Sequence, residues 1–137
     1  MKNYLVIGSG ISGVGSVKLL EHMGKKVVLY DSSDKLTAEE IRAKLPAESR
    51  AVCIAGELPT DVLESTEAVV LSPGVPVDIP LVLAFKEHGV RVMGEIELGF
   101  QEEKGSVIAI TGTNGKTTTT TLVGEIMKAG KGEEQVF

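Results

Sequence analysis

The sequence predicts an α/β protein with a doubly wound sheet of five parallel strands. Short apolar runs, which suit strands buried on both faces, alternate with segments of helical periodicity over residues 1–93. A glycine-rich turn joins the first apolar run to the first helical segment, as in a unit of two parallel strands and a crossover helix. A chain of 137 residues, 42% of them hydrophobic, has room for one ordinary domain and part of a second.

The predicted elements follow in a regular order. The strands are expected at residues 4–7, 27–30, 51–54, 67–71 and 90–93, and the helices at 12–23, 37–44 and 80–87. Gly24 suits the left-handed position that ends the first helix, and Thr37 with Glu40 is typical of the start of the second. This alternation implies a parallel sheet with helices on both faces.

The pattern restarts after residue 93. We expect a connecting helix at 95–103, a buried strand at 107–111 and a helix at 116–129. A domain boundary near Gly94 would divide the chain into residues 1–93 and 94–137. The second part is too short to enclose a core of its own, so we expect the chain to be the N-terminal piece of a longer protein. Residues 107–137 are expected to pack on the first domain or to self-associate with a second copy.

Composition excludes several classes of function. The chain has 14 Lys and Arg against 19 Asp and Glu, a net charge of -5, and no basic cluster for a nucleic-acid backbone. No apolar run approaches the roughly 20 residues that cross a bilayer, and the N-terminus lacks a signal peptide. We therefore expect a cytoplasmic protein with neither nucleic acid nor membrane as a partner. The single cysteine, Cys53, is expected to be a small buried hydrophobic residue.

The first glycine turn has the spacing G-x-G-x-x-G, directly after a strand and at the start of a helix. Gly8 permits the tight turn, Gly10 lets the backbone approach a diphosphate, and Gly13 allows close packing of helix and strand. The backbone N–H groups near Ile11 and Ser12 would point at the anion, which the helix dipole also favours. The alternative is a glycine turn that serves packing alone.

Two further segments end strands at the same edge of the sheet. Asp31 follows the second strand, where a carboxylate can accept a hydrogen bond from a ribose hydroxyl or from a nucleobase N–H. A helix cap or turn within residues 31–34 is the alternative. Ser72-Pro73-Gly74 follows the fourth strand, and Gly74 can bring a backbone N–H to a phosphate, although Pro-Gly also suits any tight turn.

A second glycine turn, at residues 112–117, also lies between a predicted strand and a predicted helix. Backbone N–H groups of such a loop wrap phosphates, Lys116 reaches the outer phosphates, and the Thr117 hydroxyl can ligate Mg²⁺. The general G-x-x-x-x-G-K-[ST] pattern requires a glycine where this chain has Ile110. The loop therefore departs from the general motif at its first position.

Taken in order, these motifs resemble those of the Mur ligase family, from about Lys2 to Gly130. They are the first glycine turn with its acidic residue, Ser72-Pro73-Gly74-Val75-Pro76, Gly94-Glu95-Ile96-Glu97-Leu98 and Gly112-Thr113-Asn114-Gly115-Lys116-Thr117. The absence of glycine at position 110 agrees with the shortened loop of that family. The resemblance implies a Rossmann-like first domain that holds the UDP part of a substrate, a central P-loop domain that binds ATP and Mg²⁺, and a third domain that brings an amino acid.

The resemblance also implies roles for individual residues. The UDP site would comprise Gly8, Gly10, Ile11, Ser12, Gly13, Asp31, Ser32, Ser72 and Gly74. The ATP site would comprise Gly112, Thr113, Asn114, Gly115, Lys116, Thr117 and Thr118, with Lys116 and Thr117 catalytic and Thr117 the metal ligand. The sequence is most similar to family members that join D-glutamate to UDP-N-acetylmuramoyl-L-alanine through an acyl phosphate, in peptidoglycan precursor synthesis. This chain alone is expected only to bind nucleotide.

Other functions stay open at this stage. Residues 8–31 also fit the NAD(P) site of an oxidoreductase, which would leave Lys116 and the threonine run at 117–121 unexplained. Residues 1–93 could instead form a binding module that holds a uridine nucleotide without reaction. A separate P-loop kinase or NTPase would need more strands and an acidic partner for Mg²⁺ after Lys116.

Overall fold

A computed structural model describes residues 2–103 and 105–136 of the chain. The chain forms two compact units, which divide after Glu102. The first unit contains the whole parallel sheet, and the second consists mainly of one long helix.

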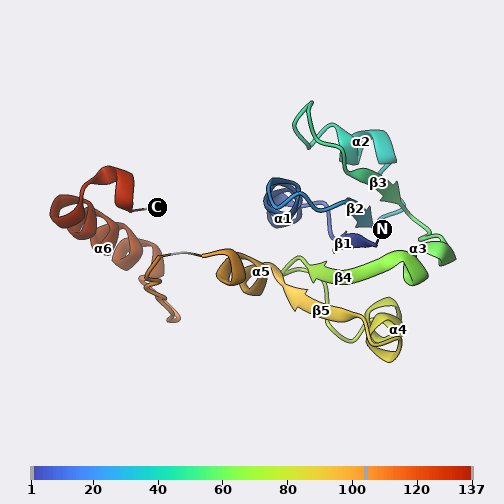
Figure 1. The fold of residues 1–137 in the computed structure, drawn as a ribbon. Coiled ribbons are helices and arrows are strands. Elements are labelled where there is room, and N and C mark those ends of the chain that lie inside the picture. The colour runs from blue at the N-terminus through green and yellow to red at the C-terminus, as the bar shows by residue number, and fades with distance from the viewer. Residues whose placement is uncertain (1, 104, 137) are drawn as a thin grey trace. The chain divides into compact units, whose positions relative to one another are not determined.

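The sheet of the first unit has five strands in the spatial order β3-β2-β1-β4-β5 (Figure 1). Its strands are β1 (Asn3–Ile7), β2 (Val27–Asp31), β3 (Val52–Ala55), β4 (Thr66–Leu71) and β5 (Arg91–Gly94). All neighbouring pairs are parallel. The prediction of a five-stranded parallel sheet is confirmed, and β1 lies at its centre.

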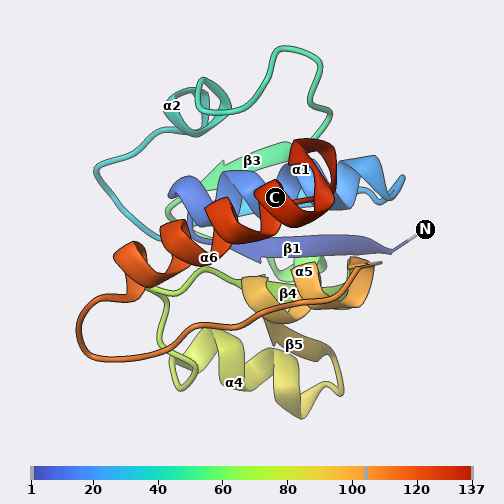
Figure 2. The ribbon, with the colours of Figure 1, turned by 90° about the vertical axis from the view of Figure 1, so that its left-hand side faces the viewer.

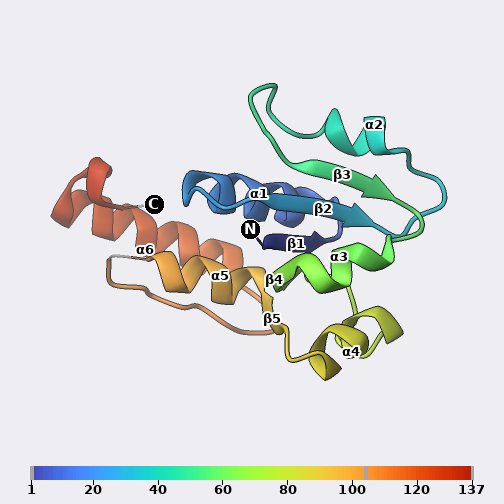
Figure 3. The same cartoon turned by 45° about the vertical axis from the view of Figure 1, so that its right-hand side comes forward.

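Five helices cover the two faces of this sheet (Figures 1 and 3). They are α1 (Ile11–His22), α2 (Ala38–Arg42), α3 (Thr60–Ser65), α4 (Pro80–Glu87) and α5 (Glu95–Glu102). Side chains of α1, α2 and α5 share one core with alternate strand residues such as Val6 and Val70. Those of α3 and α4 share a second core with the intervening residues, among them Leu5 and Val69. Figure 2 looks onto the face that α1 and α5 cover.

The ends of the helices follow local sequence signals. The Thr37 hydroxyl accepts from the Glu40 N–H at 3.2 Å, and the Glu40 carboxylate accepts from the Thr37 N–H at 2.8 Å, which confirms the capping box. Gly24 has φ +73°, the left-handed conformation predicted for it. Helix α2 ends at Arg42, two residues short of the prediction. Helix α3 was not predicted, because its six residues are too few to show a helical period.

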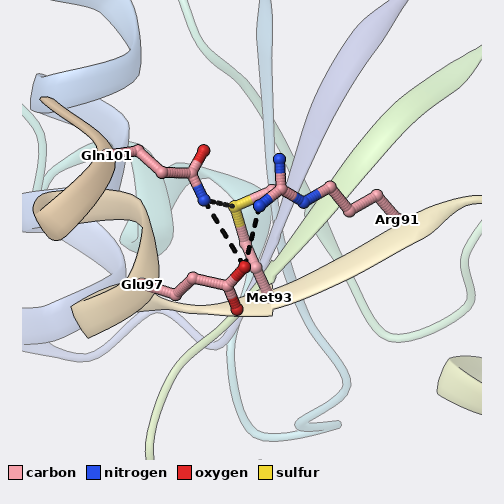
Figure 4. Close-up of polar contacts among 4 residues, drawn as sticks. All are labelled: Arg91, Met93, Glu97 and Gln101. Atoms are coloured by element: carbon pink, nitrogen blue, oxygen red, sulfur yellow. Dashed lines mark hydrogen bonds and ion pairs between the residues drawn. The ribbon is translucent and has the colours of Figure 1, made fainter.

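By its contacts, helix α5 belongs to the first compact unit, which ends at Glu102. The domain boundary near Gly94 stays a prediction. Leu98 of α5 is 2% exposed and packs into the core beneath α1. A polar cluster also connects α5 to β5: the Glu97 carboxylate accepts from Arg91 at 2.8 Å and from Gln101 at 3.4 Å (Figure 4). Helix α5 therefore packs on the sheet of the first unit through Leu98, while most of its other side chains are exposed.

The second unit contains α6 (Lys116–Lys131) and a short 3-10 turn, η1 (Glu133–Gln135). The predicted strand at 107–111 is wrong, since its backbone is irregular in the structure. A strand exists only through hydrogen bonds to a neighbour, and the described part of the chain offers these residues none. Val107 and Ile108 are accordingly more than half exposed. The first strand of the expected P-loop unit is thus not formed, and self-association through 107–137 stays a prediction.

Cys53 of β3 is half-buried beside α2, and burial, the largest influence on it, raises the pKa of its thiol. No helix of the described residues has both the length and the apolar character needed to cross a membrane. Within those residues no group of three His, Cys, Asp or Glu side chains is placed to hold a metal ion.

Candidate functional site

A cleft of about 880 Å³ opens at the carboxyl ends of the central strands of the first unit. The strand order reverses at β1, because β2 and β3 lie on one side of it and β4 and β5 on the other. Ligands of open α/β sheets bind at such a reversal, outside the carboxyl ends of the strands. Residues 7–12, 30–32, 72–76 and 79–81 line the cleft.

The structure brings nearly all of the predicted UDP-site residues together. The cleft is lined by Gly8, Gly10, Ile11, Ser12, Asp31, Ser32, Ser72 and Gly74. Only Gly13 is absent from its wall, since it lies behind the turn. The shared location is a finding, whereas the contact of each residue with a ligand stays a prediction.

Gly8 and Gly13 shape the turn through their lack of a side chain. A Cβ atom on Gly13 would lie 1.8 Å from the Gly8 carbonyl oxygen, so α1 can approach β1 only with glycine there. Gly8 has φ +101°, and a Cβ atom on it would lie 2.9 Å from the side chain of Ser72. The Ser72 hydroxyl donates to the Gly8 carbonyl at 3.2 Å. The predicted use of Gly13 for close packing is confirmed.

The amino end of α1 faces the cleft with open donors. Gly10 is the N-cap and provides no side chain to cap the helix. Apart from its neighbours in the chain, no atom of the described residues lies within 4 Å of the place where its Cβ would be. The N–H groups of Ile11 and Ser12 have no acceptor among the described residues. The first turn carries no acidic residue. These donors and the helix dipole suit an anionic group in the cleft.

Asp31 lies on the cleft wall in a network that the sequence did not reveal. Its Oδ2 accepts from the Ser9 hydroxyl at 2.6 Å and from the Ser9 N–H at 2.9 Å, and its Oδ1 accepts from the Ser33 N–H at 3.1 Å. The Lys44 ammonium donates to the Ser9 hydroxyl at 2.9 Å and to the Ser9 carbonyl at 3.2 Å. Ser9 occupies a variable position of the glycine motif, and Lys44 lies 35 residues away, so neither carried a sequence signal.

This network determines the charge of Asp31. Burial, the largest single influence, would raise the pKa of the carboxyl group. The hydrogen bonds from Ser9 and Ser33 and the nearby Lys44 ammonium together outweigh burial and lower the pKa below its usual value. Asp31 is therefore an ionised group at neutral pH, able only to accept hydrogen bonds.

The second glycine loop leads directly into α6. Gly115 is the N-cap, with φ +74°, and Gly112 has φ +155°. The Lys116 ammonium lies over this loop and donates to the carbonyl oxygens of Gly112 and Thr113. All of the predicted ATP-site residues, 112–118, are exposed. The glycine loop, the lysine and the exposed hydroxyls fit a phosphate group, while the described chain supplies no carboxylate cluster for Mg²⁺.

A comparison with protein families agrees with the order of these motifs. The family model for the Mur ligase MurD-like, N-terminal domain matches residues 2–94. The chain belongs to this Mur ligase family. The UDP-N-acetylmuramoylalanine–D-glutamate ligase of Lachnospira eligens is 48% identical over 128 residues, which are 93% of this chain. The chain spans 28% of the length of that relative, so the matched part of the Mur ligase is its N-terminal region.

Solved structures of other Mur-type ligases share the fold. A pseudomurein peptide ligase type C from Methanothermus fervidus superposes with a TM-score of 0.57 at 22% identity, covering 96% of this chain and 27% of that one. The UDP-N-acetylmuramate-alanine ligase MurC from Thermotoga maritima gives 0.56 at 21% identity, covering 93% and 29%. At these identities the likeness concerns the fold of the Mur ligase domain alone.

Proposed function

We propose that the cleft binds the UDP group of UDP-N-acetylmuramoyl-L-alanine, and that the chain is the substrate-binding part of a cytoplasmic, ATP-dependent ligase that adds D-glutamate. One observation carries the proposal: the first glycine turn, Asp31 and the Ser72–Gly74 turn meet in one cleft at the strand reversal. Membership of the MurD-like family supports the identity of the substrate.

Each wall of the cleft then binds a different part of the UDP group. The N–H groups of Ile11 and Ser12 bind the diphosphate from one side, and the backbone of Gly74 approaches it from the other. The ionised Asp31 accepts the imide N–H of uracil, with Ser32 beside it. The open space at Gly10 lets the diphosphate come close to the backbone, since none of the described side chains fills it.

The loop at residues 112–118 is proposed to handle ATP in the complete enzyme. There the substrate carboxylate attacks the γ-phosphorus, an acyl phosphate forms and ADP leaves, and the amine of D-glutamate then displaces phosphate. Lys116 would stabilise the charge that develops on the phosphoryl oxygens, and the Thr117 hydroxyl would ligate Mg²⁺. A Mg²⁺ ion held there would supply positive charge against the phosphate oxygens.

Thermal unfolding of the chain with UDP, NAD and ATP added separately tests the UDP site. UDP at 100 times its dissociation constant should stabilise the first unit by about 2.7 kcal/mol, and Asp31→Ala should reduce this effect. Stabilisation by NAD without any by UDP would instead favour the oxidoreductase alternative. We expect no ADP release dependent on the substrate and D-glutamate from this chain alone.

A further inference from the structure

The hydrogen bonds to Asp31 leave few of its acceptor positions free for a ligand. An ionised carboxylate offers about four lone-pair positions, two on each oxygen. Both positions of Oδ2 are taken by Ser9, through its hydroxyl at 2.6 Å and its N–H at 2.9 Å. One position of Oδ1 is taken by the Ser33 N–H at 3.1 Å. A single acceptor position on Oδ1 therefore remains for a group in the cleft.

Lys44 fixes the direction of the Ser9 hydroxyl. An ammonium group can only donate, so at the 2.9 Å contact with Lys44 the Ser9 oxygen must accept. The one hydrogen of the Ser9 hydroxyl is then directed at Asp31. Ser9 is 2% exposed, so water cannot replace either partner without a rearrangement of the turn.

We propose that Ser9 and Lys44 are specificity-determining positioning residues, which restrict Asp31 to one acceptor position and so select a nucleobase that presents a single ring N–H. This inference rests on the proposed function of the cleft. Uracil presents one imide N–H between two carbonyl groups. Guanine presents two adjacent donors, which pair best with both oxygens of a carboxylate, and cytosine presents an acceptor at the corresponding ring nitrogen.

The charged surroundings of Asp31 agree with an acceptor that stays ionised. Lys44 is the cation that approaches it from the segment after α2, and it lowers the pKa of Asp31. Tyr30 precedes it in β2, donates its hydroxyl to the Gly56 carbonyl at 2.7 Å, and has a pKa raised by burial and then by Asp31. Asp34 and Lys35 follow in the exposed turn.

The test is a set of dissociation constants for UDP, CDP and GDP, measured by calorimetry on the 137-residue chain. The wild type should prefer UDP. Ser9→Ala and Lys44→Met should weaken UDP binding about tenfold, as expected when a hydrogen bond to a charged group is lost. Both variants should weaken GDP binding less than UDP binding, so the preference for UDP over GDP narrows. Ser9→Ala removes the hydroxyl that occupies a position on Oδ2, and Lys44→Met lets that hydroxyl rotate away from Oδ2. The acid midpoint of UDP binding should also rise as Asp31 loses donors.

Two further variants separate positioning from folding. Lys44→Arg keeps a donor and should retain most of the preference for UDP. Lys35→Met removes the same charge from a lysine that makes no side-chain hydrogen bond among the described residues, and it should leave the preference unchanged. If Asp31→Ala weakens UDP binding but Ser9→Ala weakens UDP and GDP binding equally, or neither, the inference is overturned and the proposed function is not. A wild-type chain that fails to bind UDP would overturn the proposed function, and this inference with it.

Discussion

The α-carbon of Gly13 faces the carbonyl oxygen of Gly8 so closely that a Cβ atom on Gly13 would lie 1.8 Å from that oxygen. This contact holds the amino end of α1 against the end of β1. It thereby fixes where the free N–H groups of Ile11 and Ser12 meet the cleft. The same contact makes the turn sensitive to a single methyl group.

Gly13→Ala should therefore destabilise the first unit by about 1–3 kcal/mol, because the methyl group forces α1 away from the turn. Urea unfolding of the two proteins measures the difference. Gly15→Ala is the matched control in the same helix, since nothing lies within 4 Å of its added Cβ. It should stabilise the protein by roughly 0.5–1 kcal/mol. Equal stability of the two variants would show that the close contact is not maintained in solution.

The predictable part of this fold is the part with strong local signals. The runs that became β1, β2 and β4 are mostly apolar, and the capping box of Thr37 and Glu40 fixes the start of α2. The strand expected at 107–111 is equally apolar, yet it is not formed. An apolar run becomes a strand only beside a neighbour, which is a tertiary condition that the local sequence does not contain.

The candidate site likewise has residues that the sequence predicts and residues that it does not. The glycines and Asp31 belong to a pattern with fixed spacing, so the sequence predicts their common edge of the sheet. Ser9 and Lys44 act through side-chain geometry across 35 residues of chain, for which no spacing rule exists. The residues that line the cleft were thus predictable, whereas the hydrogen-bond partners Ser9 and Lys44 became visible only in three dimensions.

The lowered pKa of Asp31 predicts how its contribution to stability depends on pH. A carboxyl group with a lower pKa in the folded than in the unfolded state stabilises the fold above the unfolded value, about 3.9. That contribution disappears as the pH falls through the folded value. The free energy of unfolding of Asp31→Asn should therefore lie below that of the wild type at pH 7 and converge with it below about pH 4.

Asp34→Asn is the control for this titration. It removes the same charge from a carboxylate that accepts no hydrogen bond among the described residues. We expect a smaller difference from the wild type at pH 7 than Asp31→Asn produces. Denaturant unfolding at several pH values measures the free energy of unfolding of the wild type and of both variants. A difference between Asp31→Asn and the wild type that persists unchanged to pH 2 would contradict the lowered pKa of Asp31.

Lys116 should decide whether the second unit recognises phosphate. Its ammonium lies over the carbonyl oxygens of Gly112 and Thr113, at the amino end of α6. Lys116→Met should weaken ATP binding about tenfold, as for the loss of one charge-assisted contact. Lys128→Met, at the opposite end of the helix, should have little effect. The amide chemical shifts of residues 112–118 during an ATP titration measure the ATP affinity of each variant. Equal losses of affinity in Lys116→Met and Lys128→Met would indicate nonspecific attraction of ATP to positive charge.

Leu98 provides the test of where the first unit ends. It is 2% exposed under α1, so Leu98→Ala should leave a cavity and destabilise the sheet domain by about 2–5 kcal/mol. Ile96 lies on the same helix but is 81% exposed, and Ile96→Ala should change the stability by less than about 0.5 kcal/mol. Because a linker helix would tolerate both substitutions equally, thermal unfolding of the pair distinguishes a core helix from a connection. Similar midpoints for the two variants would place the boundary back near Gly94.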